Sequence, residues 1–241
     1  SFDAADAARP RDGDFELVTL HNGTRAVRHL GHGEVMHPAL GPWEEARRLY
    51  VDQPRMGERL CEPGPALVVH DVGLGAATNA VAALSLAREL GQRRQRELEV
   101  VSFEHDLAPL RLALADPEGF PFLQPFADAA RALMRDGCWE EPGLRWSLKA
   151  GDALARLEEP RPLADLVFFD PFSPASNPTM WTRAALALVR AGCREDGQGA
   201  LLMTYSAATP TRVTLLLAGF YVGAGISTGS KGETTIAATR P

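Results

Sequence analysis

The stretch that decides the fold is Asp165-Leu-Val-Phe-Phe-Asp170-Pro-Phe-Ser-Pro-Ala-Ser-Asn177-Pro-Thr-Met-Trp181. Its apolar run, residues 166–169, is typical of a central parallel strand that is covered on both faces. Asp170 follows at the carboxyl end of the strand, where open α/β sheets bind their ligands. The prolines restrict the backbone, so the loop can hold Asp170, Phe172 and Asn177 in a fixed arrangement. We interpret it as an active-site loop; the alternative is a rigid turn in which Asp170 only caps the next helix.

Strand-like and helix-like segments alternate from residue 65 onward, as in a doubly wound sheet. The pattern predicts strands at 66–72, 98–103, 144–149, 166–170, 199–204, 220–226 and 234–239. Helices are expected at 76–90, 108–115, 122–135, 153–157, 179–191 and 209–218. We therefore predict an α/β, Rossmann-like fold with a mostly parallel, seven-stranded sheet that ends in an antiparallel hairpin.

Residues 1–64 precede this pattern and indicate a small N-terminal unit. Segments 15–20 and 24–30 flank Asn22-Gly23, which is typical of a β-hairpin turn. A helix is expected over 44–51. We predict two parts: a β-hairpin with a helical cap at 1–64, and the α/β domain at 65–241.

Composition narrows the class of protein. With 241 residues, of which 45% are hydrophobic, the chain can bury one sizeable core. It has no apolar run of the roughly 20 residues that span a bilayer, and its start lacks signal-peptide features, so we expect a cytoplasmic protein without membrane contact. Its three cysteines are far apart in the sequence, which favours reduced thiols and no metal site. The net charge of -6 disfavours a large nucleic-acid surface but permits local contacts.

A cofactor site is expected after the first parallel strand, at Asp71-Val-Gly73-Leu-Gly75. The glycines allow a sharp turn and close approach of a ligand, and the carboxylate of Asp71 suits a cationic amino group. Thr78 stands where a dinucleotide fingerprint has its third glycine, which favours a methyl donor over NAD or FAD.

Two further acids follow the next two strands. Glu104 is placed to accept ribose hydroxyls, and Asp152 could accept from an adenine amino group. Each alone could be a solvated acid or a helix cap. Together with Asp71 and Asp170, they put a carboxylate at the end of four successive strands, which favours a nucleoside site.

These residues resemble the methyltransferase module of the MnmC-type aminomethyluridine N-methyltransferases, which modify the wobble uridine of bacterial tRNA. Residues 170–182 are similar to the family's Asp-Gly-Phe-x-Pro-x-x-Asn-Pro-x-Met-Trp loop, except that Pro171 replaces Gly. The supporting matches are Gly73-x-Gly75 with Asn79, 102–104, 151–153, 204–206 and 229–233. Segments 33–37 and 41–45 resemble the part that closes over the methyl donor.

The resemblance implies a class I S-adenosyl-L-methionine-dependent methyltransferase with tRNA as substrate, without the family's FAD oxidase but with a possible separate oxidoreductase partner. Asp170 would orient an amine and accept its proton. Phe172, Trp181 and Tyr205 would contact a base, or else belong to the core. His37 would help to close the pocket, or is structural. Because of Pro171, an N-methyltransferase of small-molecule or protein amines is an alternative, as is a noncatalytic nucleoside-binding domain.

Overall fold

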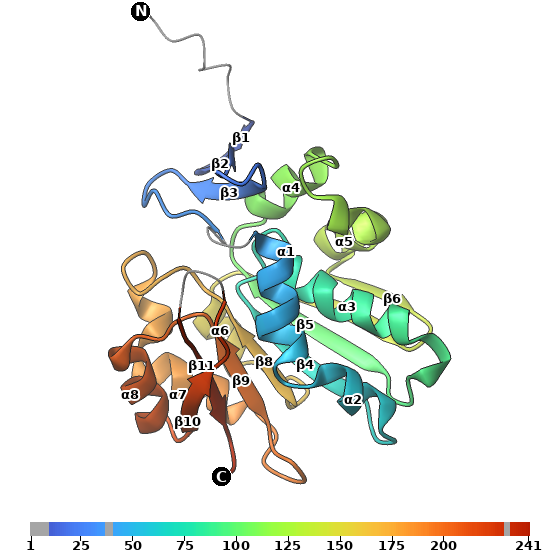
Figure 1. Cartoon of the computed structure of the whole chain (residues 1–241), viewed down its shortest axis with the longest axis vertical. Coiled ribbons are helices and arrows are strands. Elements are labelled where there is room, and N and C mark those ends of the chain that lie inside the picture. Colours follow the sequence, from blue (N-terminus) through green and yellow to red (C-terminus); the bar gives the residue numbers. More distant parts are fainter. Residues whose placement is uncertain (1–9, 37–40, 229–231) are drawn as a thin grey trace, which may run out of the picture.

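The computed structural model describes residues 10–36, 41–228 and 232–241. Its centre is an eight-stranded sheet in the order β10-β11-β9-β8-β4-β5-β7-β6 (Figure 1). The parallel strands are β4 (Leu67–Val72), β5 (Leu98–Glu104), β7 (Leu144–Ala150), β8 (Leu166–Phe169) and β9 (Leu201–Thr204). Strand order reverses at β4, which lies between β5 and β8. This reversal creates a crevice at the carboxyl ends of the strands, where doubly wound sheets bind ligands.

The side chains of β8 alternate between two cores, because successive residues of a strand point to opposite faces. Leu166 and Phe168 pack in the core that includes α3 (Thr78–Leu90), and Val167 and Phe169 pack in the core that includes α7 (Arg183–Ala191). All four side chains are buried, each stabilising the fold by about 1.5–3 kcal/mol. Burial on both faces therefore fixes the position at which the chain leaves β8 and enters the loop.

The other helices complete the two layers. They are α4 (Ala108–Ala115), α5 (Ala127–Asp136), α6 (Ala153–Glu158) and α8 (Thr209–Leu217), with 3-10 turns at Gly91–Arg93, Pro121–Phe126 and Pro178–Trp181. No helix within the three described ranges is long and apolar enough to cross a membrane.

The N-terminal part forms a small antiparallel sheet and a helical segment. The sheet contains β1 (Arg11–Asp12), β2 (Phe15–Thr19) and β3 (Arg25–His29), and it lies beside α4 (Figure 1). The helical segment contains α1 (Pro42–Glu45), a π-helix (Ala46–Asp52) and α2 (Met56–Cys61). As expected, the β2–β3 turn lies at Asn22-Gly23, where the Asn22 side chain accepts from the Thr24 amide at 3.0 Å.

Two strand counts differ from the prediction. The main sheet has eight strands instead of seven, because β6 (Cys138–Glu141) pairs antiparallel with β7. The N-terminal hairpin is a three-stranded sheet, because the two-residue β1 pairs with β2. Both added strands are short, polar and at an edge, so they bury too little apolar surface to show a strand pattern. The C-terminal pair, β10 (Tyr221–Gly225) and β11 (Thr234–Ala238), is antiparallel as predicted.

Candidate functional site

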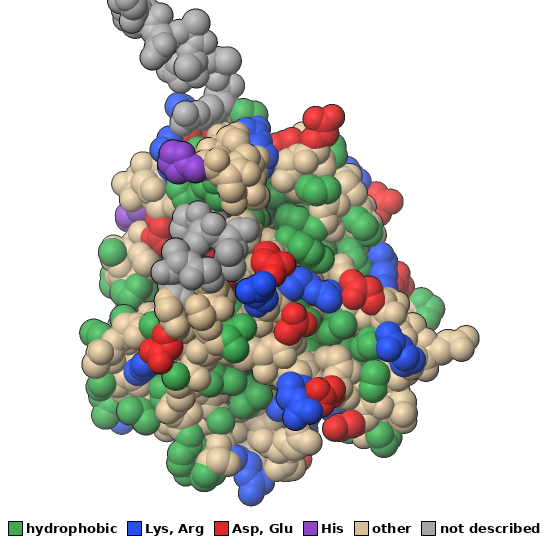
Figure 2. Space-filling model, viewed as in Figure 1, with side chains coloured by type: hydrophobic (Ala, Val, Ile, Leu, Met, Phe, Trp, Pro, Cys, Tyr) green, Lys and Arg blue, Asp and Glu red, His purple; other side chains and the backbone are tan. Residues whose placement is uncertain are grey.

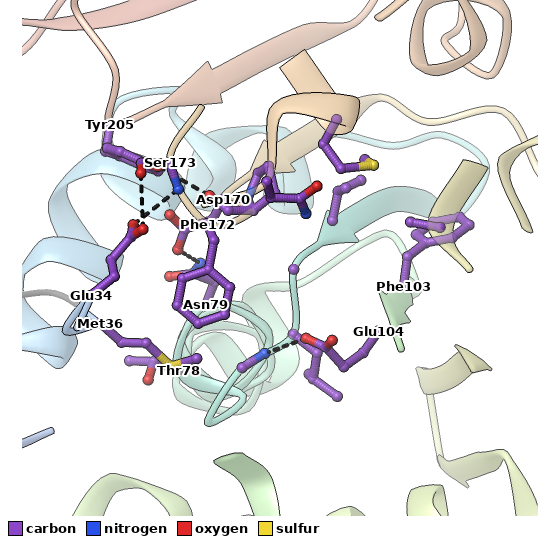
Figure 3. Close-up of a pocket in the computed structure, with 18 of the residues that line it drawn as sticks. Glu34, Met36, Thr78, Asn79, Phe103, Glu104, Asp170, Phe172, Ser173 and Tyr205 are labelled. Carbon is purple, nitrogen blue, oxygen red and sulfur yellow. Dashed lines mark hydrogen bonds between the residues drawn. The ribbon is translucent and has the colours of Figure 1, made fainter. Parts of the chain in front are cut away.

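A cavity of about 430 Å³ opens where β4, β5 and β8 end (Figure 3). Its size lies within the range of about 300–1,000 Å³ that small-molecule sites occupy. Its wall includes the turn after β4, the end of β5, the proline-rich loop (residues 170–181) and an extended segment, residues 34–36. The predicted site residues that line it are Gly73, Gly75, Asn79, Glu104, Asp170, Phe172, Asn177 and Tyr205.

The turn after β4 depends on Gly73. Its φ is +95°, and a Cβ there would lie 2.5 Å from the carbonyl oxygen of Asp170. Only glycine therefore lets this turn approach the proline-rich loop so closely. Two loops that lie about 100 residues apart in the sequence thus meet at one wall of the cavity.

Glu104 joins β5 to the same turn. Its Oε2 accepts from the Gly75 amide at 3.0 Å, and its Oε1 accepts from the amides of His105 at 2.8 Å and Asp106 at 3.1 Å. Each carboxylate oxygen offers two lone pairs. These bonds leave Oε2 able to accept from one more donor in the cavity.

Asp170 lies beside Asn79, at the start of α3 (Figure 3). The Asn79 side-chain amide donates to Asp170 Oδ2 at 2.7 Å, which fixes the rotation of the carboxylate. The pKa values of Tyr50 and Tyr205 are both raised well above the usual range of a tyrosine. Burial is the larger cause, and the negative charge of Asp170 is the second. These phenols therefore stay protonated at neutral pH and can act only as neutral hydrogen-bond partners.

Two side-chain hydrogen bonds fix the proline-rich loop, one from outside the loop and one within it. The Tyr205 hydroxyl donates to the Pro171 carbonyl at 3.0 Å, and the Trp181 indole donates to the Phe172 carbonyl at 2.8 Å. Trp181 is buried and does not line the cavity. The expected stacking of a base on this ring is therefore corrected, because its ring packs edge-on against Phe169 and Tyr205.

Asp71 also differs from the expectation of direct contact with a ligand. Its side chain is fully buried and accepts from the Ser102 hydroxyl at 2.7 Å, since Asp71 and Ser102 are paired on β4 and β5. Burial raises the pKa of Asp71 to about 8. The residue is thus buried between β4 and β5 and does not line this cavity.

Asp152 lines an adjoining cavity of about 440 Å³. Its Oδ1 caps α6 by accepting from the Ala155 amide at 2.9 Å, so the helix-cap alternative is present in the structure. Phe172 and Asn177 line both cavities. His37 lies outside the described residues.

Other lining residues are Glu34, Met36, Glu45 and Thr78. The first three lie in the segments 33–37 and 41–45 that resemble the part closing over the methyl donor, but none of the four was given its own binding or catalytic role from the sequence. Glu34 and Met36 lie two positions apart in an extended segment, so they share a face. This two-residue spacing, within a segment that resembles the part closing over the methyl donor, was the signal by which the sequence could have identified Glu34 and Met36 as lining residues. Thr78 Oγ1 and Asn79 Oδ1 are buried without a partner among the described residues, which is typical of atoms that a ligand satisfies.

The charged side chains on the surface determine how strongly the protein can attract a polyanion. On the face in Figure 2, basic and acidic side chains are interspersed. Exposed ion pairs of the described residues include Arg48–Glu44 and Arg55–Glu58. Such pairing limits the electrostatic attraction that this face can exert on a polyanion.

Comparison with known proteins identifies the family. Residues 135–240 match the family model described as S-adenosyl-L-methionine-dependent methyltransferase. The chain is 31% identical, over 87% of its length, to the tRNA 5-methylaminomethyl-2-thiouridine biosynthesis bifunctional protein MnmC of Methylibium petroleiphilum, and 30% identical, over 86%, to that of Pseudomonas paraeruginosa. It spans about a third of the length of these relatives.

A solved structure agrees with the sequence comparisons. The crystal structure of MnmC2 from Aquifex aeolicus superposes with a TM-score of 0.74 at 28% identity, covering 96% of this chain and 72% of that one. The predicted α/β fold class and the S-adenosyl-L-methionine cofactor are thereby confirmed. The chain is an S-adenosyl-L-methionine-dependent methyltransferase that is similar in sequence and fold to the MnmC proteins.

Proposed function

We propose that this methyltransferase methylates the aminomethyl group on the wobble uridine of tRNA. The observation that carries the proposal is the position of Asp170. It lies at the end of β8, in the cavity wall, with its carboxylate oriented by Asn79. A carboxylate at this position suits an amine acceptor. That the amine belongs to a uridine of tRNA is proposed from the names of the relatives.

The residues of the cavity fit S-adenosylmethionine. Glu104 can accept one ribose hydroxyl through Oε2, and Gly73 leaves room beside the proline-rich loop. The unpartnered Thr78 Oγ1 and Asn79 Oδ1 offer hydrogen bonds to polar groups of the methionine part. The bound cofactor supplies an electrophilic methyl group on a sulfonium sulfur.

The chain's own contribution is to align and deprotonate the acceptor. An alkylamine is largely protonated at neutral pH and cannot attack until it loses a proton. Asp170 orients the ammonium group and accepts that proton. The ring of Phe172, half-buried in the cavity wall, offers a face on which the uracil can stack. Alignment of this kind supplies much of the rate in methyl transfer.

Because the net charge is -6 and the surface charges are paired, we expect tRNA to bind through local contacts near the cavity. Binding of this kind involves few phosphates. We therefore expect a shallower salt dependence than that of proteins that neutralise many phosphates. The same charge distribution favours, as a second candidate, a small-molecule or protein amine as acceptor.

The test is transfer of labelled methyl from S-adenosylmethionine to tRNA that lacks the modification. Wild type is compared with Asp170→Asn, which keeps the shape of the side chain but cannot accept the proton. We expect label in RNase-sensitive material with wild type alone, and equal donor binding by both proteins. Donor binding without RNA labelling would contradict the tRNA proposal and favour the second candidate.

A further inference from the structure

Glu34 connects the N-terminal sheet to the proline-rich loop (Figure 3). Its Oε1 accepts from the Ser173 amide at 2.9 Å, and its Oε2 accepts from the Ser173 hydroxyl at 2.9 Å and from the Ser176 hydroxyl. A carboxylate that accepts several such bonds holds its partners more strongly than neutral groups would. Three donors of one loop therefore converge on a single side chain that lies 139 residues earlier in the sequence.

The segment that carries Glu34 is itself anchored. The Glu34 carbonyl accepts from the His29 amide at 2.9 Å, the Met36 amide donates to the Val27 carbonyl at 2.9 Å, and Val35 forms an antiparallel bridge with Arg28. Segment 34–36 thus pairs with β3, at the edge of the N-terminal sheet, through an isolated bridge and its two flanking backbone hydrogen bonds. This backbone pairing fixes the position of Glu34 and, with it, the place from which its carboxylate reaches the loop.

Met36 extends the same connection to the turn after β4. A Cβ at Gly75 would lie 3.3 Å from the Met36 sulfur, so this side chain packs against the turn. Glu34 and Met36 share one face of the segment and both line the cavity. One short segment therefore contacts both the proline-rich loop and the turn that borders it.

Other hydrogen bonds hold the beginning of the loop. Asn79 fixes the Asp170 side chain, Tyr205 holds Pro171, and Trp181 holds the Phe172 carbonyl. Beyond Phe172, the loop bonds to itself, with the amides of Ser176 and Asn177 donating to the Ser173 carbonyl at 2.9 and 2.8 Å. Glu34, from outside the loop, holds residues 173–176 of this second half through its bonds to Ser173 and Ser176.

We propose that Glu34 is a positioning residue, which fixes the proline-rich loop so that Phe172 and Asn177 are set for the acceptor. The N-terminal sheet, within the proposed 1–64 unit, then completes the methylation site instead of being an appendage to it. The inference deepens the proposed function and rests on it for the identity of the acceptor. Its structural part, that Glu34 orders residues 173–177, is independent of which amine is methylated.

The test compares Glu34→Ala and Glu34→Gln with a control, Glu58→Gln. Glu34→Ala removes all three bonds. Glu34→Gln keeps an oxygen for the Ser173 amide, and the serine hydroxyls can turn to accept from its nitrogen, so mainly the charge is lost. Glu58 is an exposed acid that pairs with Arg55 and does not line the cavity. Glu34→Gln also keeps the test valid if Glu34→Ala folds poorly.

Amide hydrogen exchange of residues 173–177 and donor affinity are measured first, followed by kcat and KM with tRNA. We expect faster exchange in Glu34→Ala, donor affinity within about threefold of wild type, and a loss of kcat/KM approaching the roughly 100-fold that a misplacement of about 1 Å can cost. Glu34→Gln should lie between wild type and Glu34→Ala, and Glu58→Gln should match wild type.

The outcomes separate this inference from the proposed function. Unchanged exchange at residues 173–177 in Glu34→Ala would overturn the inference, whatever the acceptor. Faster exchange with unchanged kcat/KM on tRNA would overturn the positioning role and leave the proposed function intact. Faster exchange in a protein that methylates no tRNA would overturn the tRNA acceptor and support the ordering of the loop by Glu34.

Discussion

Replacement of Gly73 by alanine should distort the cavity by a predictable amount. The added Cβ would lie 2.5 Å from the Asp170 carbonyl oxygen, 2.8 Å from its carbon and 3.0 Å from the Pro171 nitrogen. All three are backbone atoms, so a side-chain rotation cannot relieve the clash. An ordinary contact begins near 3.4 Å, so one of the two loops must move by about 0.9 Å.

Gly219 provides a matched control. Its φ is +94°, against +95° for Gly73, but a Cβ there would meet nothing within 4 Å. Gly219→Ala should therefore cost only the backbone strain, about 1–2 kcal/mol of unfolding free energy. Gly73→Ala should cost that amount plus about 1–3 kcal/mol for the overpacking. The difference between the two variants isolates the close approach of the two loops.

The assay is urea unfolding of both variants, followed by methyl transfer at saturating donor. Because misplacement by about 1 Å can lower a rate about 100-fold, Gly73→Ala should lose most of its turnover while Gly219→Ala keeps it. Equal unfolding free energies for the two variants, with wild-type turnover in Gly73→Ala, would refute the inferred contact between the turn after β4 and the proline-rich loop.

Four further substitutions test the site. Asp170→Asn should lower kcat at least about 100-fold in a methylation assay, the scale of general base catalysis, with donor affinity within about threefold. Glu104→Gln should weaken donor binding, measured by calorimetry, by about tenfold or more, because a charge-assisted bond is lost. Tyr205→Phe removes the bond to the Pro171 carbonyl and should lower kcat about three- to tenfold, which steady-state kinetics would detect. For Asp71, burial raises the pKa from 3.8 to about 8, so the folded state keeps a proton that the unfolded chain loses. Stability linked to this group is present below pH 3.8 and is lost as pH rises through about 8, by up to about 1.4 kcal/mol per pH unit. Urea unfolding of Asp71→Asn between pH 6.5 and 8 should lack this decline, and the same decline in both proteins would contradict the buried, protonated state.

The features that could be predicted from the sequence are those that a run of neighbouring residues determines by itself. The apolar run of β8 and the carboxylate that ends it follow from periodicity, because a strand buried on both faces must be continuous and apolar. The turn at Asn22-Gly23 follows equally from local chemistry. The edge strand β6 was missed because its four residues alternate between exposed and half-buried positions and carry two glutamates.

The rest of the site depends on contacts that no local pattern contains. Glu34 meets Ser173 across 139 residues of sequence. Trp181 looked like a base-stacking residue, but its indole donates to a carbonyl of its own loop, which draws the ring into the core. Asp71 is the residue before the last of β4, and its carboxylate bonds to Ser102 on β5. The acid that was expected to face a ligand at the end of the strand is therefore buried between two strands.

The measurement that tests the central claim most directly is nucleoside analysis, by mass spectrometry, of tRNA incubated with this protein and S-adenosylmethionine. The tRNA should carry the unmethylated aminomethyl group on its wobble uridine. The account predicts that this nucleoside gains one methyl group on its amino nitrogen with wild type, and that it remains unchanged with Asp170→Asn. An unmethylated wobble nucleoside after incubation with a wild-type protein that binds the donor would contradict the claim.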